Sequence, residues 1–243
     1  MKTENQTVEN KKPRKKTVIL VLAVLFLVLG IASLGYGAYI AIENQKTDSE
    51  GYALSNVYEV NSSVYVFALW MNEYDLSPIW RALGADNFAQ LKYIVTSTDP
   101  NKELFVGYAT ASDAGPYLGQ GITYETAYPE WNWIARPYYA AIEIPSTQVV
   151  NEEFPMAPPR LPQEETFWRI STHTNTTTKM YYLPLNNMYT LFIMNQDGSQ
   201  GVQATLQIGF KVPIFSWLPY LLITVGLVLV LVGVYLLLRR KQK

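Results

Sequence analysis

The residues best suited to acid–base or metal chemistry are few in this chain. It contains one histidine, His173, and no cysteine. A Ser-His-Asp triad would need His173 as its base, with a serine and a carboxylate brought near by folding, and no GxSxG nucleophile elbow accompanies it. One histidine without cysteine leaves only carboxylates to complete a tetrahedral zinc site. We therefore interpret His173 as an exposed or edge-strand residue, and we predict a non-enzymatic protein without catalytic residues or cofactors.

A second candidate site for chemistry precedes residue 200. Asn195, Asp197 and Ser199 place oxygen-bearing side chains on alternate residues, as at the start of a calcium loop. The EF-hand pattern requires glycine at its sixth position and glutamate at its twelfth, where this chain has Gln200 and Leu206. The other interpretation is a hairpin in which an Asp-Gly pair adopts the positive φ of a tight turn. We favour the hairpin, with Asn195 and Asp197 as the alternative cation site.

Four aromatic residues form a third candidate, for ligand or partner binding. Trp131 and Trp133 share one face of an extended chain, and Tyr138 and Tyr139 follow closely. Such a surface can stack on sugar rings. With Glu130 beside it, the pattern also suggests a glycosidase, an enzyme that needs two carboxylates at a defined separation. The simpler interpretation is that the aromatic side chains are buried in a core or an interface.

Two asparagines between residues 43 and 214 occur in glycosylation sequons. They are Asn61 in Asn-Ser-Ser and Asn175 in Asn-Thr-Thr. Both fall in the part of the chain that we place outside the cytoplasm, so they are candidates for glycosylation in a host that glycosylates.

Two long apolar runs, residues 17–42 and 215–238, flank the part of the chain that contains these candidate residues. Each exceeds the roughly 20 residues that a helix needs to cross about 30 Å of hydrocarbon, so we predict two transmembrane helices. The first run has an alternative interpretation as a cleaved signal peptide, with small residues such as Gly35 near its end. Its apolar length exceeds the usual 7 to 15 residues of a signal h-region, which favours a retained helix.

The charge distribution predicts the orientation. Ten of the 19 basic residues, but only two of the 20 acidic ones, lie in the tails 1–16 and 239–243. Because lysine and arginine are retained on the cytoplasmic side, both tails should be cytoplasmic tails of a cell-membrane protein, with residues 43–214 outside the cytoplasm. This outer domain has nine basic and 18 acidic residues, a formal charge of −9. We therefore exclude nucleic acid as a partner and expect the lipid bilayer to be one.

Small residues within the two apolar runs suggest that the helices contact each other. Ser33, Gly37 and Ala41 fall at four-residue spacing, and Gly226 and Gly233 lie seven residues apart. Each set occupies one helix face and permits close approach. Either the glycines are simply tolerated in lipid or the two helices pair within one chain; we favour pairing.

The sequence of the outer domain predicts mainly β-strands. The candidates are rich in β-branched and aromatic residues and end at turn formers; they are residues 64–71, 91–96, 103–109, 121–128, 134–144, 166–174, 179–185, 188–194 and 201–210. Residues 99–102 predict a hairpin between two of them. Proline-rich residues 154–162 predict an extended loop crossing between sheets. We also expect a helix at 77–84 and a turn at 113–118. The spacing predicts an antiparallel β-sandwich-like domain, making the fold membrane-anchored all-β.

Several short signatures resemble one group of proteins. They are Asp48-x-x-Gly51-Tyr52, the segment 104–109 (LFVGYA) followed by Tyr117-Leu118, Phe167-Trp168, and the segment 194–202 (MNQDGSQGV). Together they resemble uncharacterised two-helix membrane proteins common in actinobacteria and other prokaryotes, whose corresponding stretches read like FVGIA…YL and MNADGSxGV. In place of the tryptophan that often precedes the last motif, this chain has Met188 and Tyr189. The resemblance implies this topology and carries no assigned activity.

These observations favour an interaction protein. We expect the outer domain to make non-enzymatic contact with an envelope protein or surface polymer, or to serve as an accessory subunit of a membrane complex. The alternative is a sensor that binds a glycan or small ligand. Tails of about 16 and five residues are too short for an enzymatic output domain, so a sensor would signal through a partner.

Overall fold

The computed structural model describes residues 15–71, 90–132, 141–153, 155–182 and 189–241. The chain divides into two compact units, Met1–Gln45 with Ile214–Lys243, and Lys46–Pro213. The helix predicted at 77–84 lies outside the described residues, as does most of the strand predicted at 134–144.

The first unit consists of two long helices, α1 (Lys15–Asn44) and α4 (Leu218–Lys241), the latter preceded by the short 3-10 helix η3 (Pro213–Ser216). Within them, Thr17–Asn44 and Leu218–Arg239 are long and apolar enough to span a membrane. Only 11% of the most apolar window of each helix is buried, so most of the apolar surface is uncovered. The two predicted apolar helices are therefore confirmed as helices.

Glycines bring α1 and α4 together. A methyl group added to Gly30 would lie 2.9 Å from the Gly226 carbonyl oxygen, and one added to Gly37 would lie 3.0 Å from the carbonyl oxygen of Pro219. One on Gly233 would lie 3.0 Å from the carbonyl of Ala23. Residue numbers rise along α1 as they fall along α4, so the helices are antiparallel. Backbones at this separation exclude any side chain larger than hydrogen.

The contact follows a seven-residue spacing on both helices. The predicted pairing of the helices through Gly37, Gly226 and Gly233 is confirmed. Ala41, however, is only partly buried, whereas Gly30 is buried in the contact. A stripe at four-residue spacing drifts around a helix of 3.6 residues per turn, whereas a seven-residue spacing stays closer to one face. Ser33 contributes differently, because its hydroxyl donates a 2.7 Å hydrogen bond to the carbonyl of Leu222.

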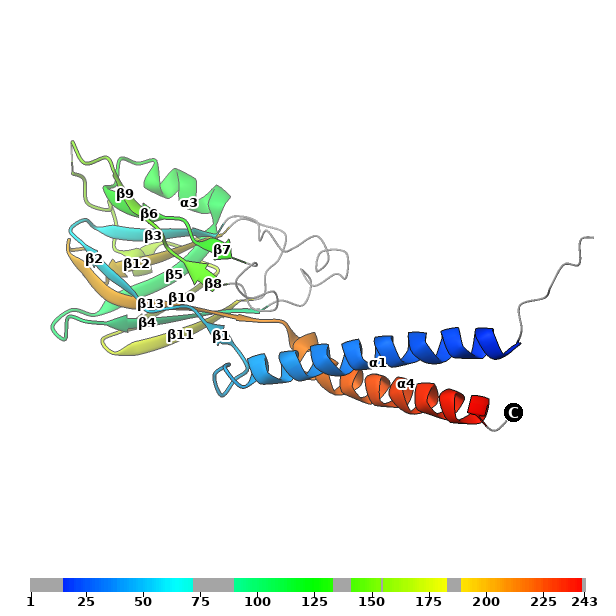
Figure 1. Cartoon of the computed structure of the whole chain (residues 1–243). Coiled ribbons are helices and arrows are strands. Elements are labelled where there is room, and N and C mark those ends of the chain that lie inside the picture. The colour runs from blue at the N-terminus through cyan, green and yellow to red at the C-terminus, as the bar shows by residue number, and fades with distance from the viewer. Residues whose placement is uncertain (1–14, 72–89, 133–140, 154, 183–188, 242–243) are drawn as a thin grey trace, which may run out of the picture. The chain divides into compact units, whose positions relative to one another are not determined.

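The second unit is built from two main β-sheets (Figure 1). Sheet A contains β1 (Ala53–Leu54), β2 (Tyr58–Ser62), β13 (Val202–Lys211), β4 (Gln90–Ser97) and β11 (Thr177–Tyr182). Sheet B has the order β10 (Ile170–Thr174), β5 (Leu104–Thr110), β12 (Tyr189–Asn195), β3 (Val66–Met71), β6 (Tyr124–Ala127) and β9 (Thr147–Val150). A small hairpin pairs β7 (Glu130–Asn132) with β8 (Ala141–Glu143). Among the described strands, all pairings are antiparallel except β3 with β6.

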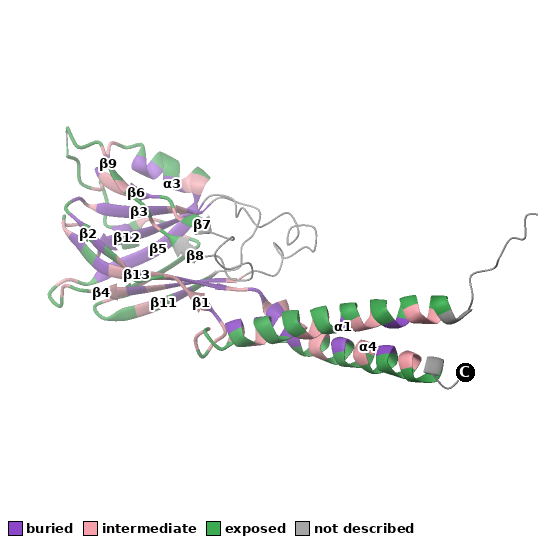
Figure 2. Ribbon diagram, in the orientation of Figure 1, coloured by how far each residue is buried: buried purple, intermediate pink, exposed green. Residues whose placement is uncertain are grey.

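The sheets pack face to face as a sandwich. Figure 2 colours most residues of β3, β5 and β12 as buried. The rings of Tyr58 in sheet A and Phe67 in sheet B lie 6.0 Å apart. Sheet A contributes Val60, Leu91, Tyr93, Val95, Met180, Ala204, Leu206 and Ile208 to this core; sheet B contributes Leu69, Leu104, Val106, Leu191 and Ile193. The antiparallel β-sandwich expected from the strand pattern is therefore present, with one parallel pair added.

The short connections between strands differ from the prediction. Residues 99–102 do not close a hairpin, because β4 belongs to sheet A and β5 to sheet B. The same change of sheet occurs between β12 and β13, where the Asp-Gly segment also predicts a hairpin, and between β2 and β3 and between β10 and β11. These four connections, which we call the arches, gather at the left in Figure 1. Turn residues reverse the chain direction both in a hairpin and in an arch. Which sheet the next strand joins depends instead on how that strand is buried in the fold.

A third layer covers the outer face of sheet B. It consists of α3 (Ala111–Leu118) and the segment 155–169. Thr110 caps α3, because its hydroxyl accepts a 3.3 Å hydrogen bond from the Asp113 N–H. The proline-rich part of this segment connects β9 to β10, the two edges of sheet B. It therefore spans one sheet, and the predicted crossing between sheets is wrong. Proline suits this position because the segment makes no ladder hydrogen bonds.

Candidate functional site

The most unusual side chain of the β-unit is a buried lysine in β4. Leu91 and Tyr93 point into the sandwich core, so the alternation of a strand places Lys92 on the outer face of sheet A. Its side chain is nevertheless 0% exposed. The lysine is buried because the segment 46–54 covers it. Gly209 leaves room for this segment, since a methyl group on Gly209 would lie 3.1 Å from Leu54 Cδ2.

Asp48 gives this segment its shape. Its Oδ1 accepts hydrogen bonds from the backbone N–H groups of Glu50 and Tyr52, both at 2.9 Å. Its own backbone N–H donates to the Tyr52 carbonyl and its carbonyl accepts from the Gly51 N–H, each at 2.9 Å. Gly51 has φ +82°, a conformation that glycine adopts at little cost. The Asp48-x-x-Gly51-Tyr52 signature is therefore a closed loop whose hydrogen bonds use only one of the two carboxylate oxygens of Asp48.

That second oxygen contacts the buried lysine. Lys92 Nζ donates to Asp48 Oδ2 and lies 3.4 Å from Glu50 Oε2. The ammonium also lies 4.5 Å from the ring centroid of Tyr52. Burial raises the pKa of the Asp48 carboxyl, but the hydrogen bonds from Lys92 and the backbone outweigh burial, so the pKa lies below its ordinary value. The carboxylate therefore remains ionised and neutralises the buried ammonium.

Glu50 connects this contact to the rest of sheet A. Its Oε1 accepts from Lys179 Nζ and its Oε2 from the Tyr181 hydroxyl, both at 2.9 Å. These hydrogen bonds lower the pKa of Glu50, and the pKa of Lys179 is raised in turn by Glu50. Lys211 Nζ donates to the Glu50 carbonyl at 2.8 Å. We call this set the Lys92 cluster; it comprises Asp48, Glu50, Tyr52, Lys92, Lys179, Tyr181 and Lys211.

The arch between β12 and β13 contains the alternative cation site. Asn195 is buried, and its Nδ2 donates to the carbonyls of Ser199 and Gln200, both at 3.0 Å. Lys102 Nζ donates to the same Gln200 carbonyl at 2.8 Å and to Ser199 Oγ at 3.1 Å. Asp197 is exposed and accepts from the Ser199 N–H. The Ser199 and Gln200 carbonyls and Ser199 Oγ are therefore taken by an amide and an ammonium, whereas Asn195 Oδ1 is buried without a hydrogen-bond partner. Within the described part of the chain, no group of three His, Asp or Glu could hold a metal.

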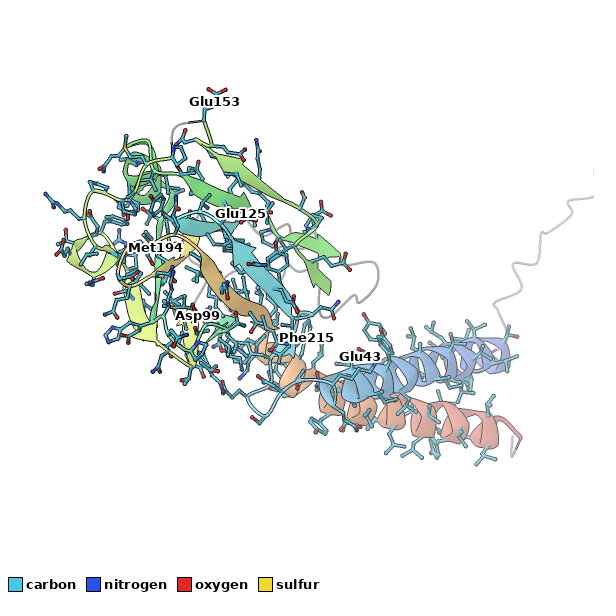
Figure 3. The ribbon with its side chains drawn as sticks, turned by 90° about the vertical axis from the view of Figure 1, so that its left-hand side faces the viewer. Glu43, Asp99, Glu125, Glu153, Met194 and Phe215 are labelled. Atoms are coloured by element: carbon cyan, nitrogen blue, oxygen red, sulfur yellow. The ribbon has the colours of Figure 1, made fainter. Side chains whose placement is uncertain are left out.

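Figure 3 shows this end of the sandwich with Asp99 and Met194 labelled. The arches are bonded to one another there. The Gln196 N–H donates to the Glu103 carbonyl at 2.8 Å, and the Gly201 N–H donates to the Val64 carbonyl at 3.1 Å. The segment 194–202, the longest signature in the sequence, thus closes the arch end of the fold.

The other signatures meet in the layer over sheet B. A methyl group on Gly107 would lie 2.8 Å from Trp168 Cε3, so the indole needs a glycine beneath it. Trp168 Nε1 donates to the Pro162 carbonyl at 2.7 Å, and its ring lies 4.4 Å from Phe167 and 6.2 Å from Tyr117, measured between centroids. The glycine of LFVGYA, Tyr117-Leu118 and Phe167-Trp168 therefore belong to one core.

Of the remaining predicted site residues, His173 and Trp131 lie on different sheets. His173 is on edge strand β10 with its side chain 62% exposed, which confirms the edge-strand interpretation. Trp131 lies in β7, while Trp133, Tyr138 and Tyr139 fall outside the described residues, so the aromatic surface stays a prediction.

The two sequon asparagines are both exposed. Asn61 lies in β2, and Asn175 lies in the arch between β10 and β11. An exposed side chain is what glycosylation requires, and the glycosylation itself remains a prediction.

Beside the Lys92 cluster, the outer face of sheet A carries polar side chains, all uncharged except Glu59. Thr205 lies opposite both Glu59 and Thr96, and Thr96 lies opposite Thr177 at 3.0 Å between the hydroxyl oxygens. We call this region the polar face; it comprises Glu59, Asn61, Thr96, Thr177, Gln203 and Thr205. A shallow pocket of about 280 Å³ lies on it.

The Lys92 cluster went unrecognised in the sequence. Asp48, Gly51 and Tyr52 stand out as a signature, but only long-range folding shows that they cover Lys92, 44 residues away. A lysine inside an otherwise apolar strand was the one available signal, and such residues are usually solvent-exposed.

No family model matches this chain, and no curated protein matches it.

Proposed function

We propose that this protein is a membrane anchor carrying a β-sandwich outside the cytoplasm for non-enzymatic contact with an envelope protein. In this proposal α1 and α4 form a transmembrane hairpin with both termini cytoplasmic. The proposal rests chiefly on the uncovered apolar surface of the two helices, where Val21, Ile31 and Leu231 are at least 60% exposed. Surfaces of this kind need lipid, and the basic tails set the orientation.

The polar face is our candidate for the contact surface. Its hydroxyl and amide groups lie in register on four neighbouring strands, which favours hydrogen bonding to a partner that is itself flat. Sugar polymers are usually bound through stacked aromatic rings, and none of the six residues of the polar face is aromatic. This composition favours a protein over a surface polymer.

Photo-crosslinking in native membranes tests the contact. A photoreactive residue at Gln203 should capture one defined protein, identified by mass spectrometry after purification in mild detergent. The same residue at the exposed Glu153 is the matched control and should not capture it. No Gln203 adduct, or equal capture at both positions, would contradict the contact. A glycan found on Asn61 would contradict it too, because the glycan would cover this face.

A sensor for a glycan or small ligand is the second candidate. It is favoured by an open pocket of about 420 Å³ lined by Gly121, Asn151, Glu152, Glu153 and Met156, a volume within the range of ligand sites. A sensor predicts that a ligand from a glycan and metabolite panel raises the unfolding temperature of wild type but not of Met156→Arg. A panel without any such shift argues against this candidate.

A further inference from the structure

In the Lys92 cluster, a nucleophile, an acceptor and a proton carrier meet in one place. We propose that Lys92 and Asp48 become joined by an intramolecular amide bond that the folded chain forms by itself, with Glu50 transferring the proton. The bond would attach the segment 46–54 covalently to β4. The proposal is independent of the partner proposed above.

The nucleophile and the acceptor are already in contact. Lys92 Nζ lies against Asp48 Oδ2, and its side chain is fully buried. The hydrogen bonds to Asp48 favour its ionised form at rest, so the reaction starts from the minor form in which Nζ has given its proton to Oδ2. Proton transfer within the pair yields the uncharged amine that can attack Asp48 Cγ. Fixed contact replaces a bimolecular encounter and so removes an entropic part of the barrier to amide formation.

The other oxygen of Asp48 lies in a site built for negative charge. Its Oδ1 receives two backbone hydrogen bonds at 2.9 Å, from Glu50 and Tyr52. Two N–H groups converging on one oxygen form an oxyanion hole, which stabilises the tetrahedral intermediate that follows attack on Cγ. The Asp48 loop therefore positions the acceptor and also polarises it.

Glu50 is placed to carry the proton. Its Oε2 lies 3.4 Å from Lys92 Nζ, and hydrogen bonds from Lys179 and Tyr181 fix its carboxylate. A carboxylate at this position can accept the proton that Nζ loses and return it to the departing Oδ2. Glu50 thus acts as a base and then as an acid, and ends unchanged.

The step balances without any further reagent. The neutral amine of Lys92 and the neutral carboxyl of Asp48 form one Nζ–Cγ bond, and the Cγ–Oδ2 bond breaks. Nζ gives up one proton, Oδ2 gains it, and one molecule of water leaves. No oxidant or reductant takes part. In a chain without cysteine, such a bond constrains the unfolded state as a disulfide would.

Peptide mapping of the full-length protein, purified from membranes in detergent, tests the bond. Trypsin does not cleave after an acylated lysine, so residues 47–81 should appear joined to residues 82–102, lighter by one water than the two peptides together. Recovery of residues 47–81 and 82–92 as separate linear peptides of full mass would overturn the proposal. This result needs no variant and therefore does not depend on a variant folding.

Variants assign the roles within the reaction. Asp48→Ala and Lys92→Ala should each abolish the joined peptide. Glu50→Gln should slow its formation about 100-fold or more, so freshly made protein should yield linear peptides. Unchanged joining in Glu50→Gln would overturn the role of Glu50.

Two controls should keep the joined peptide. Lys211→Ala removes a neighbouring lysine of the cluster that is not the nucleophile. Asp197→Ala removes an Asp-Gly pair, which can lose water by cyclising on its own backbone. That reaction also lowers the mass by one water, but it leaves the peptide linear. Loss of the joined peptide in either control would show that the water loss arises elsewhere, contrary to the proposal.

Discussion

At the level of single residues, the short signatures of this chain are explained by packing and backbone geometry. Gly107 makes room for Trp168, Asn195 closes an arch with its buried amide, and Asp48 shapes the segment that covers Lys92. Each of the three has a structural role in the folded chain. The resemblance carried by these signatures is therefore a resemblance in structural residues, and we propose that it reflects a shared fold.

Gly107 provides the sharpest test of packing. Gly107→Ala should destabilise the protein by about 1–3 kcal/mol, because the new methyl group would overlap Trp168 and Phe105. Gly115→Ala is the matched control: apart from its chain neighbours, no atom lies within 4 Å of the new methyl group, so the change should cost less than Gly107→Ala even though Pro116 follows it. Denaturant unfolding followed by tryptophan fluorescence measures both. Equal stability of the two variants would refute the role given to Gly107.

The arch at Asp197 should respond to acid. Hydrogen bonds from Ser199 lower the pKa of Asp197. Its stabilising contribution is therefore present above its unfolded value of about 3.9 and is lost as the pH falls through the lower folded value. The Ser199 amide resonance should shift in NMR spectra with a midpoint below about 3.9. In Asp197→Asn the shift should disappear; a midpoint above that value in wild type would contradict the assignment.

At the level of elements, the close approach of α1 and α4 depends on glycine. A cysteine pair at Ser33 and Leu222 should form a disulfide under mild oxidation, since the two residues are hydrogen-bonded in an otherwise cysteine-free chain. Adding Gly30→Leu should reduce this disulfide strongly, because no side chain fits against Gly226. Gly35→Leu, at a position with open space around it, should leave it unchanged. If both leucine variants cross-link equally, the helices do not pair through glycine.

The sequence predicts the elements of this fold better than their connections. Strands such as 91–96 were recognised because apolar and β-branched residues dominate them. The hairpin predicted at residues 99–102 was wrong because turn chemistry reverses the chain without choosing the next sheet. The burial of Lys92 was not predictable, since it depends on a segment whose path is fixed only in the folded chain. The roles proposed for the Trp131 region stay predictions.

At the level of the whole molecule, the chain contains two units whose surfaces differ in chemical character, one apolar and one polar. The helical unit exposes apolar side chains along most of its length. The middle of the chain, residues 43–214, has twice as many acidic as basic residues, whereas the tails are basic. This division favours a protein held in a lipid bilayer with its acidic part away from the cytoplasm. The proposed contact with an envelope protein depends on that placement.

Cysteine labelling of intact cells tests the placement most directly. Single cysteines at the exposed Glu153 and at Lys2 in the basic tail are introduced separately into the cysteine-free chain and treated with a membrane-impermeant maleimide. We predict that Glu153→Cys is labelled in intact cells and Lys2→Cys only after the membrane is permeabilised. Labelling of Lys2→Cys in intact cells, with protection of Glu153→Cys, would show the reverse orientation and contradict the account.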